Sequence, residues 1–189
     1  MHKTIFVAAL AVGLTPLAAN SAPVSYTVDP SHTYPYFEID HMGYSTMRGR
    51  FNQTEGRIII DQEKKTGSVE ITIDAESIDT AHAKRDEHLR SPDFLNTAEF
   101  PEITFKSTRV EIDGDDTEVE GNLTIAGVTK KVTLEVDHFH CAINPMSKKE
   151  HCGFDASTKI KRSDFGVNYM IPGVGDEMEI DIEVEAIRD

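Results

Sequence analysis

The sequence predicts an all-β protein, an eight-stranded antiparallel up-and-down barrel with one short helical segment near residues 80–95. Most of the chain alternates apolar and polar residues with period two, as strands buried on one face do. These stretches are long and mostly joined by short turns, which favours a closed barrel over the alternative, a two-sheet sandwich. The predicted strands cover residues 34–40, 48–61, 68–74, 103–112, 118–125, 131–139, 154–160 and 178–184.

The alternation stops between residues 77 and 105, where a short helix is expected. Residues 81–90 contain no Gly, Pro or β-branched residue, and Asp79 or Thr80 can cap the helix start. Helical spacing places one leucine and three polar residues on a single face, which is unusual for core packing. That face consists of His82, Arg85, Asp86 and Leu89.

A second helical turn is expected after this helix, because Ser91 can cap it and Pro92 suits the first helical position. Three large apolar residues follow before the next strand, and they can anchor the segment to the barrel. They are Phe94, Leu95 and Phe100.

The amino end has the pattern of a secretory signal peptide. Lys3 precedes a mostly apolar run over residues 5–19, and the small residues Ala19 and Ser21 suit cleavage after Ser21. The run is too short to span a bilayer, no later stretch is apolar enough, and no cysteine follows it for lipid attachment. We therefore expect residues 1–21 to be removed, leaving residues 22–189 as one exported, periplasmic domain without a stable membrane anchor.

The charge balance is strongly acidic, with 19 Lys and Arg against 33 Asp and Glu and a formal net charge of −14. Such a charge argues against nucleic acid or anionic membrane surfaces as partners. Its simplest role is to keep an exported protein soluble.

The two cysteines, Cys141 and Cys152, are expected to form a disulfide, because an even count in an exported chain favours pairing. His138 and His140 share one face of a strand, and this disulfide would bring His151 diagonally near His140. Zinc accepts such ligands, but no fourth ligand is evident, so no metal or other cofactor is expected.

The inward-facing positions mix large apolar residues with the small residues Gly121, Ala156 and Thr158. Periodicity alone leaves two interpretations open. The small residues either match large ones across a filled core or leave a cavity in the lumen.

Enzyme signatures are weak. The sequence has no nucleophile elbow, no glycine-rich phosphate loop and no free reactive cysteine. His82, Asp86 and His88 are the nearest approach to an acid–base group, so an enzyme acting in the lumen remains an alternative to the expected non-enzymatic protein. A protein-interaction or stress-related module is the third possibility.

Four blocks of sequence resemble the YceI-like, polyisoprenoid-binding family. They are YTVDPSHTYPYFEIDHMGYSTMRGRF at residues 26–51, RDEHLRSPDFLNTAEFPEITF at 85–105, GNLTIAGVTKKVTLEV at 121–136 and IKRSDFGV at 160–167. The resemblance runs in family order over nearly all of the chain after residue 23. It implies a lipocalin-type barrel that holds a long-chain isoprenoid or acyl lipid in its lumen, as a carrier or a store.

On this interpretation the lumen is lined by apolar residues from the strands and the helical segment. They are Phe37, Ile39, Phe94, Leu95, Phe100, Phe105, Leu123, Phe154, Ala156 and Phe165. The candidates for the head group or the mouth of the lumen are Arg85, Asp86, His88, Arg162 and Asp164. A structural role for these charges, including an Asp86–Arg90 pair on the helix and contacts of Arg162 and Asp164 with it, is at least equally compatible with the sequence.

Overall fold

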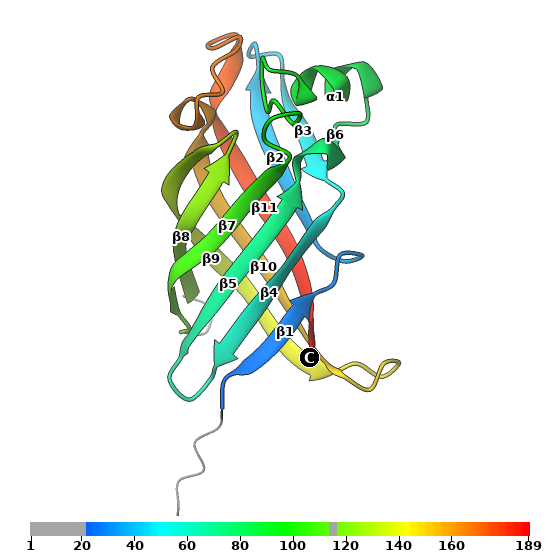
Figure 1. Ribbon diagram of the computed structural model, residues 1–189, viewed down its shortest axis with the longest axis vertical. Coiled ribbons are helices and arrows are strands. Elements are labelled where there is room, and N and C mark those ends of the chain that lie inside the picture. The colour runs from blue at the N-terminus through cyan, green and yellow to red at the C-terminus, as the bar shows by residue number, and fades with distance from the viewer. Residues whose placement is uncertain (1–21, 114–116) are drawn as a thin grey trace, which may run out of the picture.

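The computed structural model describes residues 22–113 and 117–189 of the chain (Figure 1). The predicted signal peptide lies outside the described residues, as do residues 114–116 between the predicted strands at 103–112 and 118–125. The strands are β1 (Val24–Val28), β2 (Tyr34–His41), β3 (Ser45–Phe51), β4 (Thr54–Asp61), β5 (Thr66–Asp74), β6 (Ile78–Asp79), β7 (Glu102–Glu111), β8 (Thr117–Ile125), β9 (Val128–Ile143), β10 (Glu150–Lys161) and β11 (Val174–Arg188).

These strands form a closed antiparallel barrel with eight positions in its wall, as predicted. The sheet order is β1-β4-β5-β7-β8-β9-β10-β11-β2-β3-β6, and pairing of β1 with β11 closes it. Two positions are each shared by two consecutive strands. β1 and β2 share one position, because both pair with β11. β3 and β4 share the next position, where β3 pairs with β2 and β4 pairs with β1. A short break in the chain's strand structure separates the two strands at each position.

The last three strands are longer than the sequence indicated, with 16 residues in β9, 12 in β10 and 15 in β11. At about 3.3 Å per residue they run the full height of the barrel. β11 shows the expected alternation most plainly. Met178, Ile180 and Ile182 face inward, while Glu179 and Asp181 face outward.

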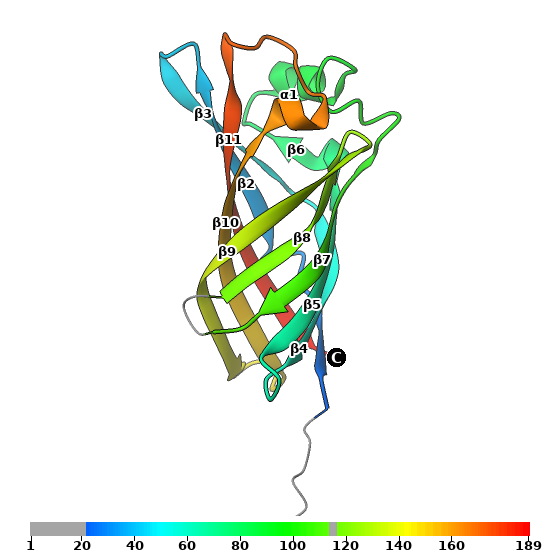
Figure 2. The same cartoon turned by 90° about the vertical axis from the view of Figure 1, so that its left-hand side faces the viewer.

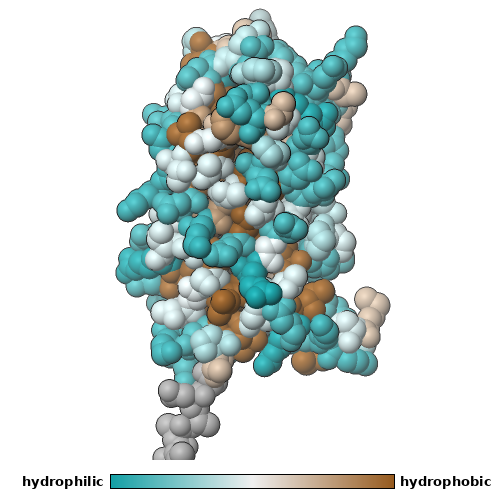
Figure 3. Space-filling view, in the orientation of Figure 1, coloured by the Kyte–Doolittle hydropathy of each residue, from teal (hydrophilic) through white to brown (hydrophobic). Residues whose placement is uncertain are grey.

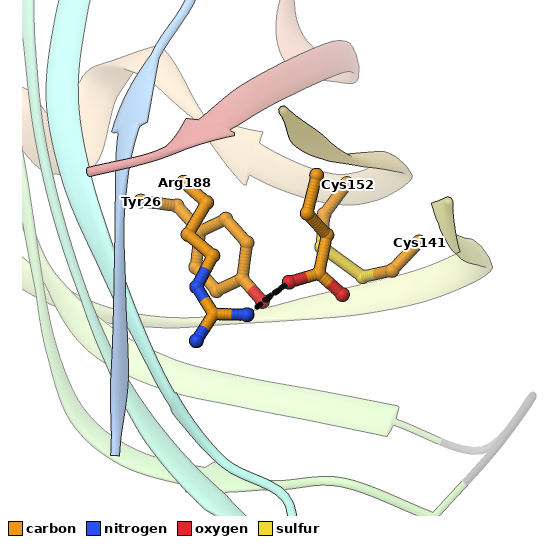
Figure 4. The surroundings of a disulfide bond; sticks show 5 residues. Tyr26, Cys141, Cys152 and Arg188 are labelled. Carbon is orange, nitrogen blue, oxygen red and sulfur yellow. Dashed lines mark hydrogen bonds and ion pairs between the residues drawn. A yellow bond between two sulfur atoms is a disulfide. The ribbon is translucent and has the colours of Figure 1, made fainter. Parts of the chain in front are cut away.

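One end of the barrel, the closed end, is filled by a compact apolar cluster. It consists of Tyr26, Val28, Ile58, Ile60, Cys152 and Ala186. The expected disulfide is confirmed here, since Cys141 and Cys152 are direct cross-strand partners on β9 and β10 (Figure 4). The Tyr26 hydroxyl donates to Glu150 at 3.3 Å, and Arg188 contacts the same carboxylate at 2.8 Å. Burial, with the neighbouring Glu150, raises the pKa of Tyr26.

The other end, the open end, is partly covered by the helical segment (Figures 1 and 2). Helix α1 spans Ala83–Arg90 and is preceded by the short 3₁₀ turn η1 (Ala75–Ser77) and by β6. The helix begins two residues later than predicted, because His82 is the N-cap and its Nδ1 accepts from Arg85 N at 3.2 Å. The segment after Ser91 forms hydrogen-bonded turns instead of the second helical turn that Pro92 suggested. No helix among the described residues is long and apolar enough to cross a membrane.

Candidate functional site

A cavity of about 600 Å³ extends from the open end into the interior of the barrel. This volume lies within the range of about 300–1,000 Å³ that is usual for small-molecule sites. Its wall is overwhelmingly aliphatic and aromatic, because the inward positions of almost every strand are apolar. Nine of the ten residues that the sequence assigned to the lumen lie on this wall: Phe37, Ile39, Phe94, Leu95, Phe105, Leu123, Phe154, Ala156 and Phe165.

Phe100 is the exception among the predicted lumen residues. Its ring lies against Gly127, in the turn between β8 and β9, where a Cβ would come within 3.0 Å of it. Phe100 therefore anchors the helical segment to that turn and does not line the cavity.

Many inward-facing side chains are only half-buried. Leu123, Leu134, Ile180 and Ile182 point into the barrel and line the cavity, yet each keeps accessible surface. In a close-packed core such residues would be fully covered by their neighbours across the barrel. The interior is thus packed at the closed end and hollow above it.

Polar groups meet the cavity at the open end, where α1 lies. Arg85 donates from Nε to the Thr80 hydroxyl at 2.7 Å and from Nη2 to the Thr80 carbonyl at 2.6 Å. Thr80 is fixed from below by Asp86, which is buried and accepts from both its amide and its hydroxyl. Within the described residues no hydrogen bond uses Arg85 Nη1, and Arg85 belongs to the cavity wall.

Three aromatic rings close part of the open end. His88 on α1 meets Phe94 edge-on at 5.1 Å between ring centroids and meets Tyr169 at 5.3 Å. Phe94 and Tyr169 are themselves 5.3 Å apart, so the three rings form one triangle. All three line the cavity, and His88 Nε2 also lies 3.0 Å from Asp93 Oδ2.

Arg162 and Asp164 come from the 3₁₀ turn η3 (Arg162–Phe165) that follows β10. The Arg162 side chain is buried and donates to the backbone carbonyls of Val167, Val174 and Gly175. Asp164 is exposed and borders a groove on the outer face. Neither residue contacts α1 through a hydrogen bond or ion pair within the described part of the chain.

The comparisons with known proteins agree with this architecture. The model of the YceI-like domain matches residues 26–186. The chain belongs to the YceI-like family. Protein YceI of Escherichia coli (strain UMN026) is 40% identical over 174 residues, which cover 90% of this chain and 91% of that protein.

Solved YceI-like structures show the same barrel. The YCEI protein of Campylobacter jejuni has a TM-score of 0.72 and 32% identity, over 80% of this chain and 90% of that one. A polyisoprenoid-binding domain from Saccharophagus degradans has a TM-score of 0.65, over 88% of this chain and 99% of that one. Its identity is 15%, so this second likeness concerns the fold alone.

The YceI-like barrel does not assemble the acid–base group considered above. His82 caps α1, Asp86 is bound to Thr80, and His88 lies beside Asp93. The expected Asp86–Arg90 pair is also replaced, because Arg90 donates to the carbonyls of Glu76 and Ile78. Helix and barrel are thus joined through backbone carbonyls, where the sequence suggested ion pairs.

Of the candidate zinc ligands of this YceI-like chain, His140 and His151 are diagonal neighbours across β9 and β10, as expected. Within the described residues, one group has ligand atoms within 4.8 Å of one another, and it is Asp29, His32 and Glu185. It does not include His138, His140 or His151. Asp29 also accepts hydrogen bonds from the amide and the hydroxyl of Ser31. Hydrogen bonds within the turn between β1 and β2 therefore account for the closeness of this group.

Among the cavity residues of this YceI-like protein that the sequence analysis did not assign are Thr80, Tyr169 and Met170. Thr80 was considered only as a helix cap. Tyr169 and Met170 lie in the irregular segment before β11, where alternation gives no signal. The one available hint was the apolar composition of residues 166–173 in a chain otherwise rich in charge.

Proposed function

We propose that this protein holds a long-chain isoprenoid, or an acyl lipid of similar length, in its lumen and carries or stores it in the periplasm. The observation that carries the proposal is the cavity itself, about 600 Å³ of space walled by apolar side chains. Such a wall offers an extended hydrocarbon chain contact on every side and offers a polar ligand no partner along most of its length.

Tail burial alone does not decide which molecule is held. Each buried CH₂ contributes about 0.8 kcal/mol relative to water, but a membrane buries the same tail equally well. Preference for the lumen therefore depends on fit and on the head group. Arg85 and His88 are the polar residues of α1 on the cavity wall, and we assign them to contact with that head group.

Two features support an exported protein. The amino-terminal 21 residues have the pattern of a cleaved signal peptide. The Cys141–Cys152 disulfide is of the kind that persists in oxidising compartments such as the bacterial periplasm.

The test is mass spectrometry of solvent extracts from protein secreted with its own signal peptide and purified without detergent. We expect an apolar molecule with a long chain in amounts that approach one per protein. The same protein unfolded in urea, extracted and refolded serves as the stripped control and should rebind an added prenyl alcohol such as geranylgeraniol. Several preparations without any extracted lipid, together with no binding of geranylgeraniol, would rule out the carrier role.

A further inference from the structure

Two loops at the open end, the first of them taken together with the start of β3, contain no charged residue. They are residues 42–47, with the sequence MGYSTM, and residues 166–173, with the sequence GVNYMIPG. Charged residues make up 28% of the chain, so their absence from all fourteen of these positions distinguishes this end from the rest of the protein. Their large apolar side chains are exposed, with Met42 at 47%, Tyr44 at 86%, Tyr169 at 41% and Met170 at 44%. We call these two loops the apolar rim.

The two loops of the apolar rim lie side by side. The Met42 amide donates to the Gly173 carbonyl at 2.8 Å, and His41 pairs with Val174 where β2 meets β11. Figure 2 shows both at the upper end of the barrel, with the segment before β11 lying between the β2–β3 turn and α1 in this view. In the space-filling view, apolar patches appear at this end, and others lie along the middle and the lower part of the same face (Figure 3).

The closed end is built differently. The turn between β4 and β5, at residues 61–66, carries four charged residues, and the turn between β9 and β10 carries three at residues 148–150. Exposed apolar residues occur there too, namely Ile143 and Met146, but they stand next to these charges. The difference between the two ends is therefore a difference in charge around similar apolar side chains.

The apolar rim is continuous with the lumen. Tyr169 and Met170 are exposed to solvent and also line the cavity, so apolar surface leads without a break from the tip into the barrel. If polar residues separated the rim from the lumen, a hydrocarbon chain would be exposed to water as it entered or left, which is unfavourable.

We propose that the apolar rim docks on the surface of a lipid bilayer, with Met42, Tyr44 and Met170 entering the interfacial layer. This inference rests on the proposed function, since it supplies the route by which a water-insoluble chain reaches the lumen. Tyrosine is a residue that membrane interfaces favour, because its ring is apolar and its hydroxyl stays hydrated. The charged helix α1 lies beside the rim, where His88 meets Tyr169 at 5.3 Å between ring centroids. The net charge of −14 makes a zwitterionic surface the better partner and an anionic one the poorer.

The chain contains no tryptophan, so one introduced tryptophan reports on its own surroundings. Tyr44→Trp places it on the apolar rim and Met146→Trp places it at the closed end, at positions exposed by 86% and 87%. With phosphatidylcholine vesicles, emission from Tyr44→Trp should shift to the blue and be quenched by brominated phosphatidylcholine. Emission from Met146→Trp should stay unchanged. No shift for Tyr44→Trp, or equal shifts for both, would overturn the docking.

A transfer experiment links the rim to loading. The double variant Met42→Ser/Tyr44→Ser should bind geranylgeraniol added from ethanol as the wild type does. It should take up the same alcohol from phosphatidylcholine vesicles roughly tenfold more slowly, because the interfacial contacts are lost. Ile143→Ser/Met146→Ser is the matched control and should load at the wild-type rate. Equal loading by all three proteins would overturn the inference. If no protein binds the alcohol from ethanol, the proposed function fails, while the tryptophan measurement still decides the docking.

Discussion

The Nε of Arg162 donates to the backbone carbonyl of Gly175 at 2.7 Å, and the side chain that makes this bond is only 4% exposed. Its other two nitrogens donate to Val167 at 2.9 Å and Val174 at 3.0 Å. One side chain thus satisfies three carbonyls around the loop that carries half of the apolar rim. Arg162 holds the shape of the open end, and all of its nitrogens are engaged in doing so.

We therefore expect Arg162→Gln to destabilise the protein. Glutamine cannot reach all three carbonyls, and each buried acceptor left unpaired costs about 1–3 kcal/mol, although water will reach some of them. The free energy of unfolding should fall by about 3 kcal/mol, measured in urea on stripped protein. An unchanged midpoint would show that the loop does not depend on Arg162.

Arg85→Gln should have the opposite profile. Arg85 is half-buried, and both of its bonds go to Thr80, which Asp86 also holds. Stability should change little, while the amount of lipid that remains bound through purification should drop. Arg85→Lys, which keeps the charge, should retain more lipid than Arg85→Gln. If both variants retain lipid like the wild type, Arg85 has no part in head-group contact.

Removing the disulfide should lower the stability of the protein and leave its lipid binding unchanged. Cys141 and Cys152 close a loop with a sequence separation of 11, and on the chain-entropy model such a crosslink contributes about 3 kcal/mol. Cys141→Ser/Cys152→Ser should lose about this much in urea unfolding, yet bind geranylgeraniol normally, because the bond lies at the closed end. Free alkylation of both thiols in unreduced, exported protein would contradict the pairing.

The turn between β1 and β2 should give stability a distinct pH dependence. Partial burial acts to raise the pKa of Asp29, but hydrogen bonds from Ser31 and His32 outweigh it and hold the pKa at about 2. The hydrogen bond to Asp29, with the nearby Glu185, raises the pKa of His32. The Asp29 contribution is present above its unfolded value near 3.8 and is lost as the pH falls toward 2. The His32 contribution is fully present below its unfolded value of 6.5 and is lost as the pH rises through the folded value.

The melting temperatures of the wild type and His32→Gln, measured across a range of pH, test whether the stability that His32 contributes falls as the pH rises. The difference should be largest near pH 5, where His32 is charged and Asp29 is ionised, and should shrink as the pH rises above 6.5 through the raised pKa of His32. His138→Gln, on the exposed face of β9, is the control for replacing a surface histidine outside the turn between β1 and β2. A difference that grows with pH would contradict the assignment.

Regular alternation made the barrel wall predictable from the sequence. β8 and β11 place one residue in two on the lumen, and a strand of that kind has only one way to bury its apolar face. β1 was missed because its five residues are too short to show a period on their own. Its place in the wall comes from pairing with β4 and β11, which are distant in sequence.

The open end was less predictable, for a physical reason. Arg162 reaches backbone carbonyls, which every residue carries, so side-chain identity gives no sign of its partners. The ring contact between His88 and Tyr169 joins segments 81 positions apart that no period relates. Gly121 shows a subtler limit. It was taken as one of the small residues around a possible cavity, but the ring of Phe105 occupies the space beside it, and a Cβ there would collide with that ring.

Ala156 provides the last prediction, because it separates a hollow barrel from a packed one. Its side chain lines the cavity on β10, 8% exposed, between Phe154 and Thr158 on the same face. In a packed core, Ala156→Phe would displace neighbours and cost about 1–3 kcal/mol. In the hollow barrel the ring should enter the cavity, leave the unfolding of stripped protein nearly unchanged and abolish binding of geranylgeraniol.

The matched variant for Ala156→Phe is Gly121→Ala, which adds a single methyl group where Phe105 already lies. It should destabilise stripped protein more than Ala156→Phe does, although the added group is far smaller, because Ala156 borders the cavity and Gly121 does not. Urea unfolding of both variants, with geranylgeraniol binding measured on the same samples, gives the comparison. If Ala156→Phe is the less stable of the two and still takes up the alcohol, the ligand is held elsewhere than in the lumen, and the barrel interior serves only as a core.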